Sequence, residues 1–373
     1  MRFILTPSFI ALLVAFSCTT GCQKMVDPPR VILELNPGEN NPRNSEGDFI
    51  TLKDGTIMFI YSKYTGESSS DHAPASLVAR YSRDEGKTWT VRDEIIVANE
   101  GGMNVMSVSL LRLQNGNIAL FYLRKNSTED CIPMMRISDD EAQSWSDPIM
   151  CIRDKPGYYV LNNDRVIQLE SGRLLMAVAR HNGPGEEWNN VGSLFAYYSD
   201  DNGVTWTSSE QVPNDMDIVT QEPGLIEMKD GRVMMYIRAS GGFQQLSFSE
   251  DKGETWSPIQ ESNIPSPLSP ATIEKMPDGK NWLLIWNNND GSDPELAGKR
   301  TPLTVAISHD EGLTWKHIKN IEADPHGWYC YIAMHFISED KLLLGYCAGN
   351  REKGNGLAVT HVTKVSKGWL EGE

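Results

Sequence analysis

Basic side chains that suit anion binding recur at matching places in a strongly acidic chain. The 373-residue sequence carries a formal net charge of -16. Six basic residues nevertheless end or precede its apolar runs, namely Arg43, Lys63, Arg124, Arg180, Arg238 and Arg300. Guanidinium groups hold carboxylates through charge-assisted, partly bidentate hydrogen bonds. The pattern predicts a basic pocket for an anionic ligand, whereas the overall charge excludes nucleic acid, whose phosphates would be repelled.

A repeated turn signature indicates the elements that must position these residues. Ser-x-Asp-x-Gly-x-x-Trp occurs five times, at 82–89, 138–145, 199–206, 249–256 and 308–315. The second copy has Ala142 at the glycine position. Each copy follows a β-like run, so it predicts a tight turn between strands. In this Asp box the aspartate accepts backbone N–H bonds, the glycine supplies a positive φ, and the tryptophan covers the neighbouring sheet.

A second signal, an apolar run on each side of a two-residue polar turn, occurs six times. The turns are Asp54-Gly55, Asn115-Gly116, Ser171-Gly172, Asp230-Gly231, Asp278-Gly279 and Glu339-Asp340. The first five hairpins are each followed by an Asp box, which gives four strands per unit of about 50 to 60 residues. The sequence therefore predicts an all-β fold, a six-bladed β-propeller with four-stranded antiparallel blades, as one domain over 23–373. Scattered hairpins in a β-sandwich are the alternative.

Blade topology predicts where a ligand site belongs. No Asp box follows the last hairpin, so we expect residues 31–35 to supply the outermost strand of that blade. In a four-stranded meander the hairpin turns and the Asp boxes share one edge, which leaves the opposite face for binding. The polar residues expected there include Asn104, Asn163, Asp164, Glu222 and Tyr329 at first-strand starts, the basic residues above, and Asp71 and His72.

From about Arg43 to Cys347 these positions resemble the bacterial and animal exo-sialidases, a family of six-bladed Asp-box propellers. Sialidases carry an aspartate shortly before the strand that leads to the first Asp box, and Asp71 stands there. They also carry a glutamate that opens a blade and an arginine that ends its second strand, matched by Glu222 and Arg238. An arginine precedes the last Asp box and a tyrosine opens the final blade, matched by Arg300 and Tyr329.

The resemblance implies a retaining exo-acting glycoside hydrolase that releases terminal sialic acid from glycoconjugates without a metal or organic cofactor. Tyr329 would be the nucleophile, Glu222 would accept its proton, and Asp71 would be the acid and base. Tyr331, two residues further on, is the competing nucleophile.

The resemblance also implies how the substrate is held. The substrate-binding residues would be Arg43, Arg238 and Arg300 as the carboxylate clamp, with Lys63, where an arginine is frequent, and Asp164.

Two departures weaken the match. Sialidases place the first arginine in Phe/Tyr-Arg-Ile-Pro, whereas Arg43 lies in Asn-Pro-Arg-Asn-Ser-Glu. A glutamate that usually steadies this arginine is missing where Tyr346 runs into Cys347, and Glu46 is a candidate substitute. Two other functions therefore stay open. One is a glycosidase for another acidic or neutral terminal sugar, and the other is a non-catalytic glycan-binding propeller, since Asp boxes are structural.

The first 22 residues read as a bacterial lipoprotein signal. Met1-Arg2 and an apolar run over 3–16 precede Cys22, the expected lipidated residue; Cys18 and an ordinary signal peptide are the alternatives. We expect an exported protein in the periplasm or at the outer membrane or cell surface, touching a membrane only through its lipid. No later stretch approaches the ~20 apolar residues of a spanning helix.

The remaining cysteines are Cys131, Cys151, Cys330 and Cys347, and they show no metal-site spacing. Cys330 and Cys347 could face each other across a hairpin, although ordinary buried cysteines fit the sequence equally well.

Overall fold

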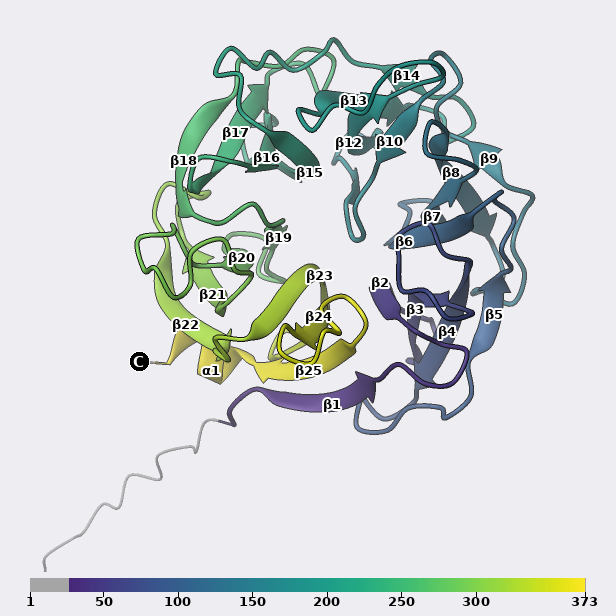
Figure 1. Ribbon diagram of the computed structural model, residues 1–373, viewed down its shortest axis with the longest axis vertical. Coiled ribbons are helices and arrows are strands. Elements are labelled where there is room, and N and C mark those ends of the chain that lie inside the picture. Colours follow the sequence, from purple (N-terminus) through teal and green to yellow (C-terminus); the bar gives the residue numbers. More distant parts are fainter. Residues whose placement is uncertain (1–26, 373) are drawn as a thin grey trace, which may run out of the picture.

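The computed structural model describes residues 27–372, and nearly all of its regular structure is β-strand. The sheets follow one another around a central axis with their first strands innermost (Figure 1). This is the all-β propeller fold that the repeats predict. The one helix of the described residues, α1 (Lys367–Glu371), is five residues long, and no helix there is long and apolar enough to cross a membrane. The signal segment and Cys22 lie outside the described residues.

Four of the sheets contain four strands each. The first is β2 (Asn44–Thr51), β3 (Ile57–Tyr64), β4 (Ala75–Ser82) and β5 (Glu94–Val97). The next two are β15 (Thr220–Glu227), β16 (Val233–Ala239), β17 (Phe243–Ser249) and β18 (Gln260–Pro265), then β19 (Thr272–Lys275), β20 (Trp282–Asn287), β21 (Leu303–Ser308) and β22 (Lys316–Glu322). The last combines β23 (Gly327–Ser338), β24 (Lys341–Asn350) and β25 (Thr360–Ser366) with β1 (Arg30–Leu35).

The fifth sheet has nine strands in two antiparallel runs. The first run is β6 (Asn104–Arg112), β7 (Ile118–Lys125), β8 (Cys131–Ser138) and β9 (Ile149–Met150). The second is β10 (Tyr158–Val160), β11 (Val166–Gln168), β12 (Leu174–Asn182), β13 (Ser193–Ser199) and β14 (Thr207–Ser208). A single parallel pair, Tyr158 with Cys131, joins the two runs.

Both ends of the described chain meet in the last sheet. Strand β1 pairs antiparallel with β25, from Arg30 opposite Lys364 to Leu35 opposite Thr360. The expected outer strand at 31–35 is therefore confirmed. This pairing ties the two ends of the described chain together within one sheet.

The Asp boxes fold as the signature predicts. In the first, Ser82 Oγ donates to Asp84 Oδ1 at 2.9 Å, and the amide nitrogens of Gly86 and Thr88 donate to Ser82 Oγ and Asp84 Oδ1 at 2.9 and 2.8 Å. The indole of Trp89 donates to the carbonyl of Gly86 at 3.1 Å. The serine and aspartate contacts recur in the other four copies.

Hairpin turns and Asp boxes do share one edge. Glu141, in the second Asp box, accepts hydrogen bonds from the amide of Lys53 at 2.9 Å and from both terminal nitrogens of Arg112 at 2.9 and 2.8 Å. Lys53 and Arg112 flank the first two hairpin turns. The opposite face is thus left for the ends of strands that carry the candidate site.

Ala142 marks a strained position in this edge. It has φ of 63°, a conformation that favours glycine, and it occupies the glycine position of its Asp box. We expect Ala142→Gly to raise the free energy of unfolding by about 1 kcal/mol, because relief of strain exceeds the added entropy of the unfolded chain. Denaturant unfolding followed by tryptophan fluorescence measures this.

Gly203→Ala is the matched control, and it should lower stability. Gly203 has φ of 90°, and an added Cβ would lie 2.3 Å from Cε of Met135. A loss of stability in Ala142→Gly would mean that the backbone at 142 is not strained.

Candidate active site

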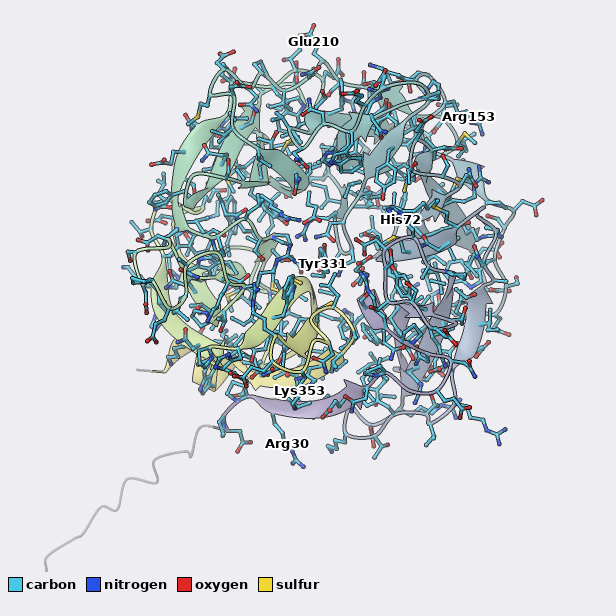
Figure 2. All side chains as sticks on the ribbon, in the orientation of Figure 1. Arg30, His72, Arg153, Glu210, Tyr331 and Lys353 are labelled. Atoms are coloured by element: carbon cyan, nitrogen blue, oxygen red, sulfur yellow. The ribbon has the colours of Figure 1, made fainter. Side chains whose placement is uncertain are left out.

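A cavity of about 280 Å³ lies where the innermost strands begin, on the face opposite the Asp boxes. Its charged and aromatic lining is Glu46, Asp71, Lys125, Tyr158, His181, Trp188, Glu222, Arg238, Arg300, Trp328 and Tyr331. Tyr331 lies close to the centre of the ring in Figure 2. Three of the arginine and carboxylate positions predicted from the sequence, Glu222, Arg238 and Arg300, meet here with Asp71.

β-Bulges near the starts of four innermost strands aim side chains into this cavity. The ladder slips between Ser45 and Asp48, between Met106 and Ser109, between Gln221 and Gly224, and between Cys330 and Ala333. Each bulge contains a residue with positive φ that lines the cavity, namely Glu46 (56°), Ser107 (59°), Glu222 (41°) and Tyr331 (56°). Bulges interrupt the regular alternation of side chains and can redirect one of them.

Tyr331, Glu222 and Arg238 form the centre of the site. The hydroxyl of Tyr331 donates to Glu222 Oε1 at 3.2 Å, and Arg238 Nη1 lies 2.7 Å from Glu222 Oε2. Burial acts to raise the pKa of Glu222, but Arg238 and Arg300 outweigh it and lower this pKa. Burial, followed by the charge of Glu222, raises the pKa of Tyr331 well above its usual range. In the free site Glu222 is therefore ionised and Tyr331 keeps its proton.

Arg300 lies against the same tyrosine. Its guanidinium carbon is 5.7 Å from the centre of the Tyr331 ring and 5.3 Å from that of Trp328. Burial opposes its charge, but Cys330, Tyr331 and Glu222 raise its pKa above the usual range. Its Nη1 is buried and has no hydrogen-bond acceptor among the described residues. Arg300 is therefore a charged donor available to an anionic ligand.

Asp71 lines the opposite wall of the cavity and is paired with Arg43, which does not itself line the cavity. Arg43, only 1% exposed, lies 2.5 Å from Asp71 Oδ1 through Nη1 and 2.6 Å from Glu46 Oε1 through Nη2. Glu46 therefore contacts Arg43, as expected if it takes the place of the missing glutamate. Burial acts to raise the pKa of Asp71, but Arg43 outweighs it and lowers this pKa. Asp71 is therefore ionised in the free site.

The family described as BNR repeat-like domain matches residues 92–344, well over half of the chain. This chain belongs to the BNR-repeat family. The sialidases of Paraclostridium sordellii and Clostridium perfringens are each 29% identical to it, over 236 and 232 residues. Those alignments cover 55% of this chain in both cases, and 55% and 58% of the relatives. The BNR-repeat chain thus spans little more than half the length of these sialidases.

A solved structure shows the same fold at lower identity. The leech intramolecular trans-sialidase matches with a TM-score of 0.72 and 15% identity, covering 93% of the BNR-repeat chain and 71% of the leech chain. At this identity the likeness shows the propeller fold alone. Together with the family match and the two sialidase relatives, it confirms the resemblance to sialidases.

Tyr331 lines the cavity and Tyr329 does not, although the sequence interpretation preferred Tyr329 to Tyr331 as the nucleophile. Tyr329 is 5% exposed and packs edge-on to Tyr346 at 6.4 Å between ring centres, within an apolar cluster. The two tyrosines were expected on one face of a regular strand. The bulge after Cys330 changes that alternation and turns Tyr331 to the cavity instead.

Three of the predicted substrate-binding residues do not line the cavity either, namely Arg43, Lys63 and Asp164. Lys63 pairs with Asp93, the residue before β5, at 2.5 Å and does not line the cavity. Asp164 lines a second cavity, described below.

Lys125 is a cavity residue that the sequence interpretation missed. It is 1% exposed, donates from Nζ to the carbonyl of Asp71 at 2.7 Å, and lies 5.2 Å from the centre of the Tyr158 ring. Arg124, the residue singled out at this strand end, does not line the cavity. Adjacent residues of a strand point to opposite sides of the sheet. Which of Arg124 and Lys125 faces the cavity therefore depends on the pairing register of the strand.

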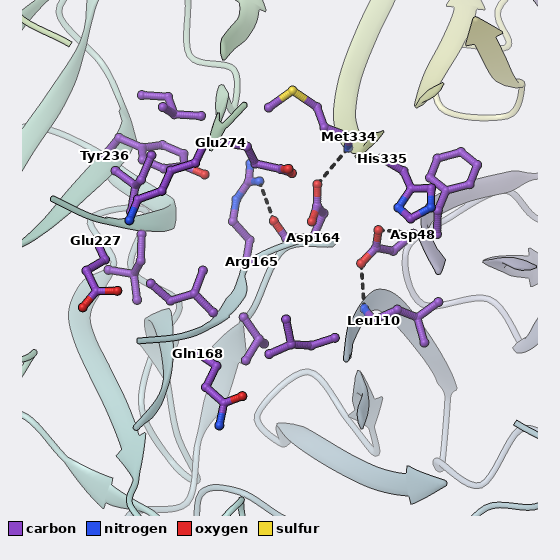
Figure 3. A pocket seen from close by; sticks show the side chains of 18 residues that line it. Asp48, Leu110, Asp164, Arg165, Gln168, Glu227, Tyr236, Glu274, Met334 and His335 are labelled. Atoms are coloured by element: carbon purple, nitrogen blue, oxygen red, sulfur yellow. Dashed lines mark hydrogen bonds between the residues drawn. The ribbon is translucent and has the colours of Figure 1, made fainter. Parts of the chain in front are cut away.

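The second cavity, of about 370 Å³, follows the same innermost strands further along the axis. Figure 3 shows Asp164 between Glu274 and Asp48, with Arg165 alongside. Burial raises the pKa of all three carboxyl groups. No set of three potential ligands within residues 27–372 is arranged to hold a metal ion. Asp164 instead accepts from the amide of Met334 at 3.0 Å, a structural contact.

His335, in this second cavity, couples stability to pH. Its Nε2 lies 2.7 Å from the hydroxyl of Thr51, and burial lowers its pKa from 6.5 to about 4. The unfolded chain takes up this proton first as the pH falls, so the contribution of His335 is complete above pH 6.5 and is lost between about 6.5 and 4. The loss is about 3 kcal/mol, at 1.36 kcal/mol per pKa unit.

His335→Gln should flatten this dependence while keeping a hydrogen bond to Thr51. The measurement is the free energy of unfolding at pH 8 and pH 4 in both proteins. Equal losses of stability between these pH values would show that His335 does not titrate with folding.

Proposed function

We propose that the chain is a retaining exo-acting glycoside hydrolase that cleaves terminal sialic acid from glycoconjugates. The observation that carries the proposal is the hydrogen bond from Tyr331 to Glu222 in a cavity that also holds Arg238, Arg300 and Asp71. A tyrosine paired with a carboxylate suits a substrate whose anomeric carbon bears a negatively charged carboxylate group. A carboxylate nucleophile would be repelled by that charge, and sialidases are the known exception to the two-carboxylate rule.

The first step forms a bond between Tyr331 Oη and the anomeric carbon as the bond to the glycosidic oxygen breaks. Glu222 accepts the phenolic proton, and Asp71 donates a proton to the leaving oxygen. In the second step Asp71 accepts a proton from water, whose oxygen displaces the tyrosine from the anomeric carbon, and the tyrosine recovers its proton from Glu222. The sugar leaves with its original anomeric configuration.

Substrate binding prepares both carboxyl groups for these steps. In the free site Arg238 and Arg300 keep Glu222 a weak base, and Arg43 keeps Asp71 ionised. A substrate carboxylate held by Arg238 and Arg300 offsets their charge, which raises the pKa of Glu222, and its own negative charge raises the pKa of Asp71 as well. Glu222 then becomes a better base, and Asp71 can take up the proton that it donates.

We also propose that the propeller has six blades. The nine-stranded sheet divides at the single Tyr158–Cys131 pair into two antiparallel runs, which together with the four-stranded sheets make six. This number agrees with the sequence repeat, in which six hairpins occur and an Asp box follows each of the first five.

Tyr331→Phe should lower turnover of an aryl sialoside by at least 10³-fold, because the attacking oxygen is removed while the ring stays. Tyr329→Phe is the matched control, and it should keep near-normal kcat because its side chain lies outside the cavity. Release of the aryl group and of free sialic acid from sialyllactose measures both.

Full activity in Tyr331→Phe would refute the tyrosine mechanism. Tight binding of sialyllactose without product release would favour a glycan-binding protein. Turnover of a different aryl glycoside alone would favour another terminal sugar.

We also propose that the protein is exported and lipid-anchored through Cys22. The basic start, the apolar run over 3–16 and the small residues before Cys22 support this. Cys22→Ala should release the protein from the membrane fraction and abolish incorporation of labelled fatty acid, whereas Cys18→Ala should do neither. Fatty-acid labelling that persists in Cys22→Ala would contradict the anchor.

A further inference from the structure

Lys125, at the end of β7, is a buried cation of the cavity that forms no ion pair with a described carboxylate. It is 1% exposed, and its Nζ lies between two other lining residues, 2.7 Å from the carbonyl of Asp71 and 5.2 Å from the centre of the Tyr158 ring. The carboxylates that line the cavity pair with arginines instead. Lysine is rarely buried without an ion-pair partner, because its charge then loses hydration without compensation.

The contact with the Asp71 carbonyl does not account for this lysine. Nδ2 of Asn104 donates to the same carbonyl at 2.8 Å and to the carbonyl of Ala73 at 2.8 Å. The backbone that carries Asp71 is therefore already held by a neutral donor, which costs less to bury than an ammonium group. An ammonium has three N–H donors, and the Asp71 carbonyl takes one of them. Two donors and the positive charge remain for a ligand.

Arg43, which the resemblance to sialidases assigns to the substrate carboxylate, is occupied by the protein itself. Each nitrogen of its guanidinium has an acceptor: Nε donates to Ser45 Oγ at 2.9 Å, Nη1 to Asp71 Oδ1 at 2.5 Å and Nη2 to Glu46 Oε1 at 2.6 Å. Arg43 is 1% exposed and does not line the cavity. Its charge is balanced by two carboxylates, whereas the charge of Lys125 is not.

We propose that Lys125 is the third cation that binds the carboxylate of an acidic terminal sugar, in place of Arg43 and together with Arg238 and Arg300. All three cations line the same cavity of about 280 Å³. An anionic ligand supplies the countercharge that the buried ammonium lacks, and charge-assisted hydrogen bonds are strongest where water is excluded. A neutral sugar leaves the ammonium without a countercharge, so Lys125 selects for an acidic sugar. The inference rests on the proposed function, because it requires the cavity to bind an acidic terminal sugar.

Calorimetric binding of free sialic acid and of its carboxamide tests the role of Lys125 without turnover. The carboxamide keeps the ring and the hydroxyl groups but removes the negative charge. Lys125→Gln removes the cation and keeps a donor for the Asp71 carbonyl. We expect this variant to bind the acid about ten-fold more weakly, the effect of losing one hydrogen bond between charged groups, and to change binding of the carboxamide by less than about two-fold.

Arg124→Gln is the matched control, because Arg124 is the adjacent residue of β7 and does not line the cavity. It should bind both ligands as wild type does. An equal loss of affinity for acid and carboxamide in Lys125→Gln, or no loss for either, would overturn the inference. A lower kcat for an aryl sialoside with unchanged binding of the acid would mean that Lys125 only positions the Asp71 backbone, and would overturn it as well.

Failure of the proposed function gives a different result. If wild type binds no sialic acid, the proposed substrate is wrong, and glucuronic acid with its carboxamide tests Lys125 by the same comparison. Absence of binding to both acids would overturn the inference together with the proposed function. Lys125→Met, whose side chain has a similar length and no charge, takes the place of Lys125→Gln if the glutamine variant does not fold.

Discussion

The bulges in the innermost strands are the constraint on which the candidate site depends. A regular strand would alternate its side chains between the axis and the neighbouring sheets, which would leave few of them at the mouth of the channel. At Glu46, Ser107, Glu222 and Tyr331 the chain instead adopts a positive φ, and each of these side chains reaches the same cavity. Non-glycine residues in this conformation cost of order 1 kcal/mol or more each, and such strain gathers at functional sites.

The rest of the fold holds these strained segments in place. Each bulged strand pairs with a largely buried second strand. Close approaches follow the bulged residues: a Cβ on Gly47 would lie 2.5 Å from Cζ of Phe59, and one on Gly224 would lie 2.3 Å from Cζ of Tyr236. Glycine is therefore required where the strand returns to the ladder. The Asp boxes act at the far edge, where they fix the outer turns, and take no part in the cavity.

Much of the fold was predictable from the sequence because its signals are local. The Asp boxes and polar turns gave the strands, the shared edge and the face of the site, and residues 31–35 were correctly paired with the end of the chain. Glu222, Arg238 and Asp71 were placed by their positions at strand ends.

The sequence interpretation missed cavity residues where a shift of one residue along a strand decides which side chain faces the cavity. Tyr329 was preferred to Tyr331, and Arg124 was considered instead of Lys125, since a bulge or a one-residue shift is not visible in residue types. The small residues after the bulged positions, Gly47, Gly224 and Ala333, are the one trace that these bulges leave in the sequence.

The charges of the free site also bear on which sugar it suits. Glu222 is paired with Arg238, and Asp71 with Arg43, so both carboxyl groups rest in states unsuited to catalysis. A neutral terminal sugar would bring no charge into the cavity, and both ion pairs would persist. A sugar with a carboxylate on its reacting carbon would meet the arginines as it places that carbon beside Tyr331. Binding of such a sugar would then also activate the two carboxyl groups. The site therefore suits an acidic terminal sugar better than a neutral one, although the chain as a whole is strongly negative.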